Sequence, residues 1–414
     1  MEAETRAKLY IGIDMDECRA LISFLREGER EPVSASRGKD DETFLFPTSI
    51  YAGRGGHYLY GAEAEKKKGS STGDFYSQLY LRACDLVGTD GFEEAIARLT
   101  LFVKRLIRLR ETIYQKEKFD QYLVIAVPEI HSRAAAVMDA LRTALGKEIC
   151  SLRCMDYAES FYYYTYHREA SVWQNDVALF DFSDISVQFF LLARSAHAVP
   201  QLVRSGSREW PFPEKGETDR DAWFLSVAKE AFAKRIISGV FLLGEGFDGN
   251  WIADSKSLRF IAPNRRVFVG KNLYTKGAAY AAFEEEQPGR WPYQYDCPYK
   301  LASSVSIKVS DGGKDRLLDL ARIGENWFET ERSADVILKG SEEIEFYVRR
   351  RGEKQAELVR MPLEDVWGRE EITRKVRIHA SCPDAHTLKI RVRDLGFGVF
   401  FASTGMEWNF EIRV

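Results

Sequence analysis

The chain has 414 residues, of which 45% are hydrophobic and 29% are charged, so it can bury the cores of two or three globular domains. Its 59 basic and 63 acidic residues leave a net charge of −4, which excludes a global positive field for nucleic acid or for an anionic membrane. No stretch approaches the ~18 apolar residues of a membrane-spanning helix, and the first residues lack the apolar core of a signal peptide, so we expect a cytoplasmic protein.

Six cysteines are scattered along the chain, with no CxxC pair and no histidine at metal-ligand spacing. This pattern favours buried free thiols over a metal or redox site. The cysteines are Cys18, Cys84, Cys150, Cys154, Cys297 and Cys382.

Two stretches repeat one pattern: a β-run, an aspartate at a turn and a second β-run. The first is Lys8–Leu25 with Asp14 at the turn, and the second is Asp176–Leu192 with Asp181. Apolar runs on both sides of a short polar turn predict two β-hairpins. Because the same design occurs about half a domain apart, the chain is expected to contain an internal repeat.

The segment between the hairpins alternates between strand and helix patterns. Phe44–Glu65 predicts two strands and the start of a helix, and Phe92–Lys116 has helical apolar spacing. Tyr122–Pro128 has the apolar run of a buried parallel strand. The alanine-rich Ser132–Leu145 predicts a helix that stops at Gly146.

After the second hairpin, the chain again predicts strands and helices in turn. Val199–Ser205, Val240–Leu243 and Val267–Val269 have strand patterns. Asp219–Ile237 predicts an amphipathic helix with Ile236 on its apolar side, and Leu273–Phe283 predicts a closing helix.

The C-terminal part alternates at period two, which predicts an antiparallel β-sandwich. Residues 287–298, rich in proline and aromatic residues, indicate a linker before it. The expected strands are Ser304–Val309, Arg316–Leu320, Asp335–Leu338, Glu343–Val348, Lys375–Ile378, Thr387–Val392 and Val399–Ala402.

The two hairpins resemble the phosphate-binding hairpins of the superfamily that joins actin, the sugar kinases and the heat-shock chaperone ATPases of the DnaK type. The chaperone form begins Ile-Gly-Ile-Asp-Leu-Gly-Thr-Thr, and Ile11–Cys18 here is IGIDMDEC. The resemblance implies a two-lobed actin-like ATPase fold of ribonuclease H-like repeats followed by the sandwich. The implied division is a first lobe at 1–170, a reduced second lobe at 171–286, the linker, and the sandwich at 299–414.

The nucleotide motifs of that superfamily are degenerate in this chain. Asp14 and Asp181 remain, and the resemblance implies that they are vestigial catalytic residues that could bind magnesium. Side chains with a β-carbon now stand where the family has glycine, and they restrict the turn conformations. A carboxylate at ~4 Å from a phosphate charge repels it by several kcal/mol at an effective dielectric near ~20. The positions that match the nucleotide loops are Gly12, Asp16, Glu17, Ser183, Asp184, Ser186, Gly244 and Gly246.

Three further departures concern the cleft that the resemblance implies. Tyr157 stands where the family has the glutamate that positions the attacking water. The aromatic run Phe161–Tyr166 is either a core helix or a set of rings that fills the cleft. The subdomain with which the chaperones cover the purine is missing, because only Gly206–Gly239 separates the third and fourth strands of the second repeat.

We therefore expect a non-catalytic chaperone-like or scaffold protein that needs no cofactor. Its partner would be a protein or peptide, and neither nucleic acid nor a membrane, with the oligomeric state open. An active chaperone-type ATPase that uses ATP and magnesium through remodelled loops is the alternative, and an actin-type filament or cell-division protein is a further one. If the hairpin tips converge, their acidic side chains raise one another's pKa. These acids are Asp14, Asp16, Glu17, Asp181 and Asp184.

Overall fold

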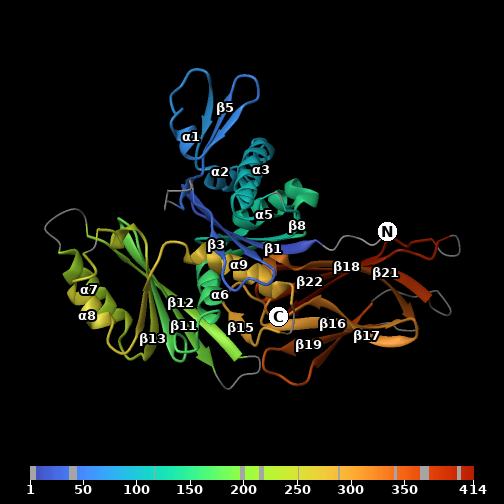
Figure 1. Ribbon diagram of the computed structural model, residues 1–414. Coiled ribbons are helices and arrows are strands. Elements are labelled where there is room, and N and C mark those ends of the chain that lie inside the picture. Colours follow the sequence, from blue (N-terminus) through green and yellow to red (C-terminus); the bar gives the residue numbers. More distant parts are fainter. Residues whose placement is uncertain are drawn as a thin grey trace. The chain divides into compact units, whose positions relative to one another are not determined.

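The computed structural model describes residues 6–36, 44–115, 117–195, 201–213, 219–249, 251–287, 290–339, 343–363, 373–398 and 402–414 (Figure 1). The chain is a mixed α/β protein with several sheets. It divides into two compact units, Met1–Ser195 with Val203–Tyr293 and Ala196–Leu202 with Gln294–Val414. No helix among the described residues is long and apolar enough to cross a membrane.

The first sheet of the first unit has the strand order β3-β2-β1-β8-β9. β1 and β2 form an antiparallel hairpin, while β8 runs parallel to β1 and β9 runs parallel to β8. The strands are β1 (Ala7–Met15), β2 (Arg19–Arg26), β3 (Val33–Ser34), β8 (Phe119–Val127) and β9 (Ser151–Asp156).

Five neighbouring strands of the second sheet repeat that order as β12-β11-β10-β13-β14. β10 and β11 form the antiparallel hairpin, and β13 and β14 continue in parallel from β10. The strand order thus contains the internal repeat that the two hairpin patterns predict. The strands are β10 (Asp176–Phe182), β11 (Ser186–Ser195), β12 (Gln201–Pro211), β13 (Ile237–Leu243) and β14 (Arg266–Val269).

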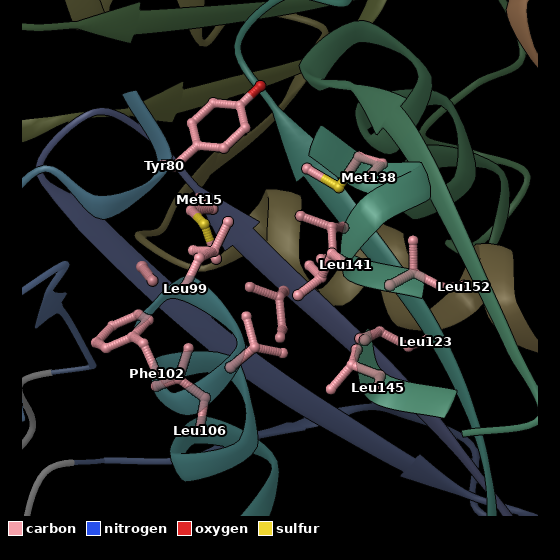
Figure 2. Close-up of a cluster of buried hydrophobic side chains, with 14 of the residues drawn as sticks. Met15, Tyr80, Leu99, Phe102, Leu106, Leu123, Met138, Leu141, Leu145 and Leu152 are labelled. Atoms are coloured by element: carbon pink, nitrogen blue, oxygen red, sulfur yellow. The ribbon is translucent and has the colours of Figure 1, made fainter. Parts of the chain in front are cut away.

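The outer face of the first sheet is covered by α3 (Phe92–Arg108) and α5 (Ser132–Leu145). Figure 2 shows Phe102 of α3 and Leu141 of α5 among the buried side chains beside β1, and Leu99, Leu123 and other residues belong to the same cluster. α5 follows the sequence prediction in both bounds, because the chain leaves the helix at a residue with positive φ, Gly146 (52°).

Two helices lie between the sheets, and each packs against the sheet of the other repeat. α6 (Tyr157–Tyr166) follows β9 of the first sheet, and its Phe161 ring meets Phe241 of β13 edge-on, with centroids 5.6 Å apart. α9 (Leu273–Glu285) follows β14 of the second sheet and packs on β1, β2 and β8. The two repeats therefore exchange their last helices and cannot separate without unpacking both.

Glycine makes this exchange possible at two points. A β-carbon on Gly12 of β1 would lie 2.0 Å from the carbonyl oxygen of Thr275, whose Oγ1 donates a 2.7 Å hydrogen bond to the Gly12 carbonyl. A β-carbon on Gly277 of α9 would lie 2.1 Å from the carbonyl oxygen of Ser160 in α6. The close approach of α9 to β1 and to α6 depends on these two residues.

Smaller elements complete the first unit. A three-stranded sheet has the order β6-β5-β7. These further elements are β4 (Phe46–Pro47), β5 (Ile50–Gly53), β6 (Tyr58–Tyr60), β7 (Gly73–Tyr76), α1 (Ala62–Glu65), α2 (Leu79–Asp85), α4 (Arg110–Tyr114), α7 (Arg220–Ala231), α8 (Lys256–Ile261) and the 3₁₀ turns η1 (Gly146–Glu148) and η2 (Glu245–Phe247).

The second unit contains two antiparallel four-stranded sheets, β17-β16-β19-β20 and β18-β21-β22-β23. Their apolar side chains share one core, in which Phe346 of the first sheet and Phe410 of the second have ring centroids 6.4 Å apart. The strands of these two sheets are β16 (Ser303–Asp311), β17 (Lys314–Ala321), β18 (Glu331–Lys339), β19 (Glu343–Arg350), β20 (Glu357–Pro362), β21 (Thr373–Asp384), β22 (Thr387–Asp394) and β23 (Glu407–Arg413), with the 3₁₀ turn η3 at Trp327–Glu329. The short strand β15 (Tyr293–Asp296) precedes them and is not part of either sheet.

Several sequence predictions are wrong in detail. The helix expected over Asp219–Ile237 ends at Ala231, and Ile236 is 75% exposed in the turn before β13 instead of lying on an apolar face. The segment interpreted as a linker includes the boundary between the two compact units, and it also contains β15. Cys18 and Cys150 are exposed, whereas Cys84, Cys154, Cys297 and Cys382 are buried.

The C-terminal strand predictions missed β20 and β23. β20 escapes detection because it is an edge strand whose residues are all at least partly exposed, so its alternation is weak. The expected strand Val399–Ala402 falls mostly outside the described residues, as do the first two residues of the strand expected at Val199–Ser205.

The helix exchange leads to a stability prediction. Alanine is favoured over glycine in helices by about 1 kcal/mol, yet Gly277→Ala is expected to destabilise the protein by about 1–3 kcal/mol, because the new methyl group overlaps α6. Chemical denaturation measures the change. Gly206→Ala is the control, since no atom lies within 4 Å of a β-carbon there. Equal stability of the Gly277 variant and the parent would contradict the described helix crossing.

Candidate functional site

A cavity of about 330 Å³ lies within the first unit, where the strands β1 and β10 end. Ligands usually bind to parallel sheets at this side, beyond the carboxyl ends of the strands. Six of the ten positions that the sequence analysis singled out line the cavity, and four do not. The lining positions are Asp14, Asp16, Asp181, Ser183, Asp184 and Gly244, and the others are Gly12, Glu17, Ser186 and Gly246.

Two tyrosines hold the two retained aspartates. The Tyr157 hydroxyl at the start of α6 donates a 2.7 Å hydrogen bond to Asp14 Oδ1. The Tyr274 hydroxyl near the start of α9 donates a 2.9 Å hydrogen bond to Asp181 Oδ2. The two rings stack on each other with centroids 3.9 Å apart and planes 9° apart. Each repeat thus contributes one aspartate and one tyrosine, and the stacked rings join the repeats at the floor of the cavity.

Burial dominates the electrostatics of these four groups. Burial, together with the charges of Asp16 and Asp181, raises the pKa of Asp14 to about 8, although the hydrogen bond from Tyr157 lowers it. Burial also raises the pKa of Asp181. The pKa values of both tyrosines lie well above their usual value because of burial and then of the neighbouring carboxylate. At neutral pH Asp14 is therefore mostly a neutral carboxyl group.

An ion pair crosses the mouth of the cavity. Arg19 at the start of β2 contacts Glu245, which follows β13 of the other repeat. Arg19 Nε also lies 3.5 Å from Asp16 Oδ2. The second cation of the lining, Lys271, pairs with Asp248 at 2.8 Å. Both cations are thus already committed to carboxylates of the chain.

The tips of both hairpins are closed by their own side chains. Asp16 Oδ1 accepts hydrogen bonds from the backbone N–H groups of Cys18 (2.7 Å) and Arg19 (2.6 Å). Ser183 Oγ accepts from the backbone N–H groups of Ile185 (3.3 Å) and Ser186 (3.1 Å). Backbone N–H groups in such turns are the usual donors to a bound phosphate, and here the side chains occupy these four.

The glycines after β13 have packing partners within the chain. A β-carbon on Gly244, which has a φ of 95°, would lie 2.3 Å from the carbonyl oxygen of Phe182 and 2.7 Å from Asp181 Oδ1. A β-carbon on Gly246 would lie 2.4 Å from the Phe182 ring. The Gly246 carbonyl also accepts a 2.9 Å hydrogen bond from Trp251 Nε1. These contacts account for both glycines without a ligand.

The aromatic run Phe161–Tyr166 does not line the cavity. Phe161, Tyr162 and Tyr166 are buried in α6, which agrees with the core-helix interpretation. The aromatic side chains that do line the cavity are Tyr157 and Tyr274. The sequence analysis noted Tyr157 only as a departure from the family's glutamate, and it did not single out Tyr274. A tyrosine at the start of each closing helix was the signal available for this pair.

The donor set does not suit a divalent cation. Among the described residues, no group of three or more histidine, cysteine or acidic side chains is arranged to hold a metal ion. Metal ligands must be deprotonated, whereas Asp14 has a pKa of about 8 and each aspartate already accepts a tyrosine hydroxyl.

Comparison with known proteins identifies the family of the chain. Residues 31–298 match the family described as "Family of unknown function (DUF5716) C-terminal", and the chain belongs to this family. Residues 300–414 match the "Domain of unknown function (DUF8552)". No curated protein matches the chain. Among solved structures, a non-polymerising mutant of MamK bound to AMPPNP is similar over 68% of this chain and 100% of that chain, with 12% sequence identity and a TM-score of 0.40.

The raised pKa of Asp14 predicts how stability depends on pH. The pKa is about 8 in the folded protein against a usual value of 3.8, so the folded state binds more protons between these values. Stability should therefore fall as pH rises from about 4 to about 8, by ~1.4 kcal/mol for each unit of pKa difference. We expect Asp14→Asn to remove this fall, so that the variant is more stable than the parent at about pH 9 but not at about pH 4.5.

Thermal unfolding across this pH range measures the effect. Asp74→Asn is the matched control, because Asp74 is exposed and its loss also removes one carboxylate. Parallel pH profiles for the parent and Asp14→Asn would show that Asp14 ionises normally and would refute the buried arrangement.

The tyrosine hydroxyls predict a second effect. Tyr157→Phe keeps the stacked ring but leaves the buried Asp14 carboxyl without its donor, which should cost about 1–3 kcal/mol. Tyr274→Phe should cost a similar amount through Asp181. Denaturant unfolding measures both, with Tyr58→Phe as the control, since Tyr58 is 44% exposed. Two neutral variants would mean that the hydroxyls do not hold the aspartates.

Proposed function

We propose that this chain is a non-catalytic member of the actin-type ATPase superfamily that acts as a scaffold for a protein partner. The repeated strand order and the exchange of α6 and α9 between the sheets support the actin-type fold. The proposal that the nucleotide cleft has become a structural contact rests on one observation, the stacked Tyr157–Tyr274 pair with its hydroxyls on Asp14 and Asp181.

The chemistry of nucleotide hydrolysis has no support in these residues. An ATPase of this superfamily needs ionised aspartates for magnesium and its waters, but Asp14 is mostly protonated at neutral pH and both carboxyls accept tyrosine hydroxyls. Tyr157 stands in place of the glutamate that would position water, and a neutral phenol with a raised pKa is no general base. The chain's own residues instead hold the two repeats together.

The phosphate-binding groups are also committed elsewhere. Asp16 and Ser183 bind the backbone N–H groups of the two hairpin tips, and Arg19 pairs with Glu245 across the mouth. A nucleotide would have to displace these contacts before it gained any of its own. We therefore assign the first unit a fixed conformation, which suits a scaffold better than a nucleotide-driven switch.

The partner surface belongs to the same proposal. In the described part of the chain, the outermost strands of the second unit's sheets are β17 and β20 in one and β18 and β23 in the other. An extended peptide can add to such an edge through main-chain hydrogen bonds. Binding of this kind is chaperone-like, because it depends little on the peptide sequence.

The test is a titration of the full chain with MgATP and with magnesium alone, followed by thermal unfolding and calorimetry. A ligand at a hundred times its Kd stabilises a protein by about 2.7 kcal/mol, and we expect no stabilisation and no binding heat at millimolar MgATP. The double variant Tyr157→Ala with Tyr274→Ala removes both rings from the cavity. Titration of this variant with MgATP tests whether the two tyrosines are what excludes the nucleotide.

Three outcomes separate the alternatives. Stabilisation of the parent by MgATP that Asp14→Ala abolishes would establish the active ATPase and overturn the proposal. Growth of light scattering or of sedimenting polymer at high protein concentration would favour the actin-type filament instead. No response to nucleotide, with a monodisperse protein in both conditions, is the result that the scaffold predicts.

A further inference from the structure

The carboxyl groups of Asp14 and Asp181 each keep one oxygen without a hydrogen-bond partner. The Tyr157 hydroxyl binds Oδ1 of Asp14, and the Tyr274 hydroxyl binds Oδ2 of Asp181. Over the described ranges of the chain, no hydrogen bond reaches Asp14 Oδ2 or Asp181 Oδ1. Neither of these two oxygens is fully buried, in contrast to unpaired atoms such as the Tyr80 hydroxyl oxygen. A ligand in the cavity that both aspartates line can therefore reach them.

The environment of Asp14 is unfavourable for a carboxyl group with one unpaired oxygen. Asp14 is only 7% exposed, and it lies in β1 among buried residues. A polar group removed from water in this way is costly unless it is hydrogen-bonded. In the ionised form Asp14 Oδ2 lacks a donor, and in the neutral form the proton on that oxygen lacks an acceptor. A ligand that donates a hydrogen bond and carries positive charge would remove this cost.

The lining of the cavity is short of positive charge. Five of its side chains are acidic and two are basic. The two cations already have partners, since Arg19 pairs with Glu245 and Lys271 pairs with Asp248. As far as the structure describes the chain, neither cation donates a hydrogen bond to the two retained aspartates. An excess of carboxylates around one concave surface attracts a further cation.

We propose that this cavity binds a primary ammonium group on a short alkyl chain. A guanidinium group pairs best with both oxygens of one carboxylate, but a tyrosine hydroxyl already occupies one oxygen of each aspartate. An ammonium group instead has three separate donors, which single oxygens of different carboxylates can accept. Leu21, Leu45 and Leu243 provide an apolar lining for the alkyl chain. The volume of about 330 Å³ lies within the range of small-molecule sites.

The same ammonium chemistry is available from a free amine and from a lysine side chain of a bound peptide. The inference goes beyond the proposed scaffold function, which assigns no ligand to this cavity. When the ammonium group binds, Asp14 releases its proton to solvent and the resulting carboxylate faces the cation. The binding test is therefore carried out at about pH 8.5, above the Asp14 pKa of about 8 and below the pKa of ~10.4 typical of an alkyl ammonium group such as that of lysine.

Isoleucine-methyl NMR of the full chain reports on the site directly, because Ile185 lines the cavity and is 77% exposed. Ile236 is 75% exposed but does not line the cavity, so it is the internal control. The probes, at constant ionic strength, are n-butylamine for a free amine and Nα-acetyl-lysine N-methylamide for a peptide lysine. We expect n-butylamine to shift the Ile185 signal alone, with a Kd of about 1 mM for so small a ligand. n-Butylguanidine should bind at least about tenfold more weakly, the effect of one lost hydrogen bond to a charged group.

Matched variants locate the site. Asp14→Asn and Asp181→Asn should each raise the Kd for n-butylamine about tenfold or more. Arg19→Gln should lower the Kd, because it removes a positive charge from the lining. A folding defect would weaken binding in all three variants, so the opposite signs separate binding from folding. Glu17→Gln is the control and should leave the Kd unchanged, since Glu17 is exposed at the same hairpin tip but does not line the cavity.

The outcomes divide as follows between support and refutation. A shift with n-butylamine alone assigns the site to a free amine, and a shift with both probes extends it to a peptide lysine. No shift of the Ile185 signal with either probe at about 20 mM, where a millimolar ligand is near saturation, would overturn the inference. Equal affinity for n-butylguanidine, or equal weakening by Glu17→Gln, would also overturn it by reducing binding to general charge attraction. Each of these failures leaves the scaffold proposal standing, whereas a shift with MgATP would overturn that proposal.

Discussion

The exchange of α6 and α9 between the two sheets is the constraint on which the rest of the first unit depends. α9 leaves the last strand of its own repeat and packs on β1, β2 and β8 of the other. α6 contacts Phe241 of β13 through the rings of Phe161 and Tyr164, and the two helices meet where Gly277 lies against Ser160. This crossing brings both helix starts to one point, so Tyr157 and Tyr274 stack there. Asp14 lies near the end of β1 and accepts the hydrogen bond of the Tyr157 hydroxyl. Asp181 lies near the end of β10 and accepts that of the Tyr274 hydroxyl. The candidate site is thus a consequence of helix packing more than of the hairpin turns.

Charge is distributed unevenly along the first sheet. At the end of β1 the acidic groups outnumber the available cations, because Arg19 is bound to Glu245 and burial keeps Asp14 mostly protonated. At the start of β8 the balance is reversed, and Arg110 and Gln121 hold unpaired polar atoms. Where the superfamily resemblance implies an anion site, the residues are therefore arranged against an anion. The opposite end of the strands, where basic side chains outnumber acidic ones, carries no recognisable sequence motif.

Local pattern was enough to predict the hairpins and α5, because alternation of apolar residues and the glycine after the helix act within a few residues. The convergence of Asp14 and Asp181 came from the resemblance between the hairpins. The contact between Tyr157 and Tyr274 could not be predicted, since it joins residues more than a hundred positions apart through the crossing of two helices. The exposed Ile236 was misassigned because an apolar residue in a turn is indistinguishable from one on a helix face without the third dimension.

The free energy needed to open the cavity beside Asp14 and Asp181 bears on whether it can admit a nucleotide. To admit a nucleotide, the cavity would have to give up the stacking of two rings, worth about 0.5–1.5 kcal/mol, and two hydrogen bonds to carboxyl groups. These hydrogen bonds are worth about 0.5–1.5 kcal/mol for the neutral Asp14 and about 1.5–3 kcal/mol for Asp181 when it is charged. The sum, about 2.5–6 kcal/mol, would weaken a micromolar ligand by about two to four orders of magnitude. This cost agrees with the proposal that the stacked tyrosines hold the two repeats together.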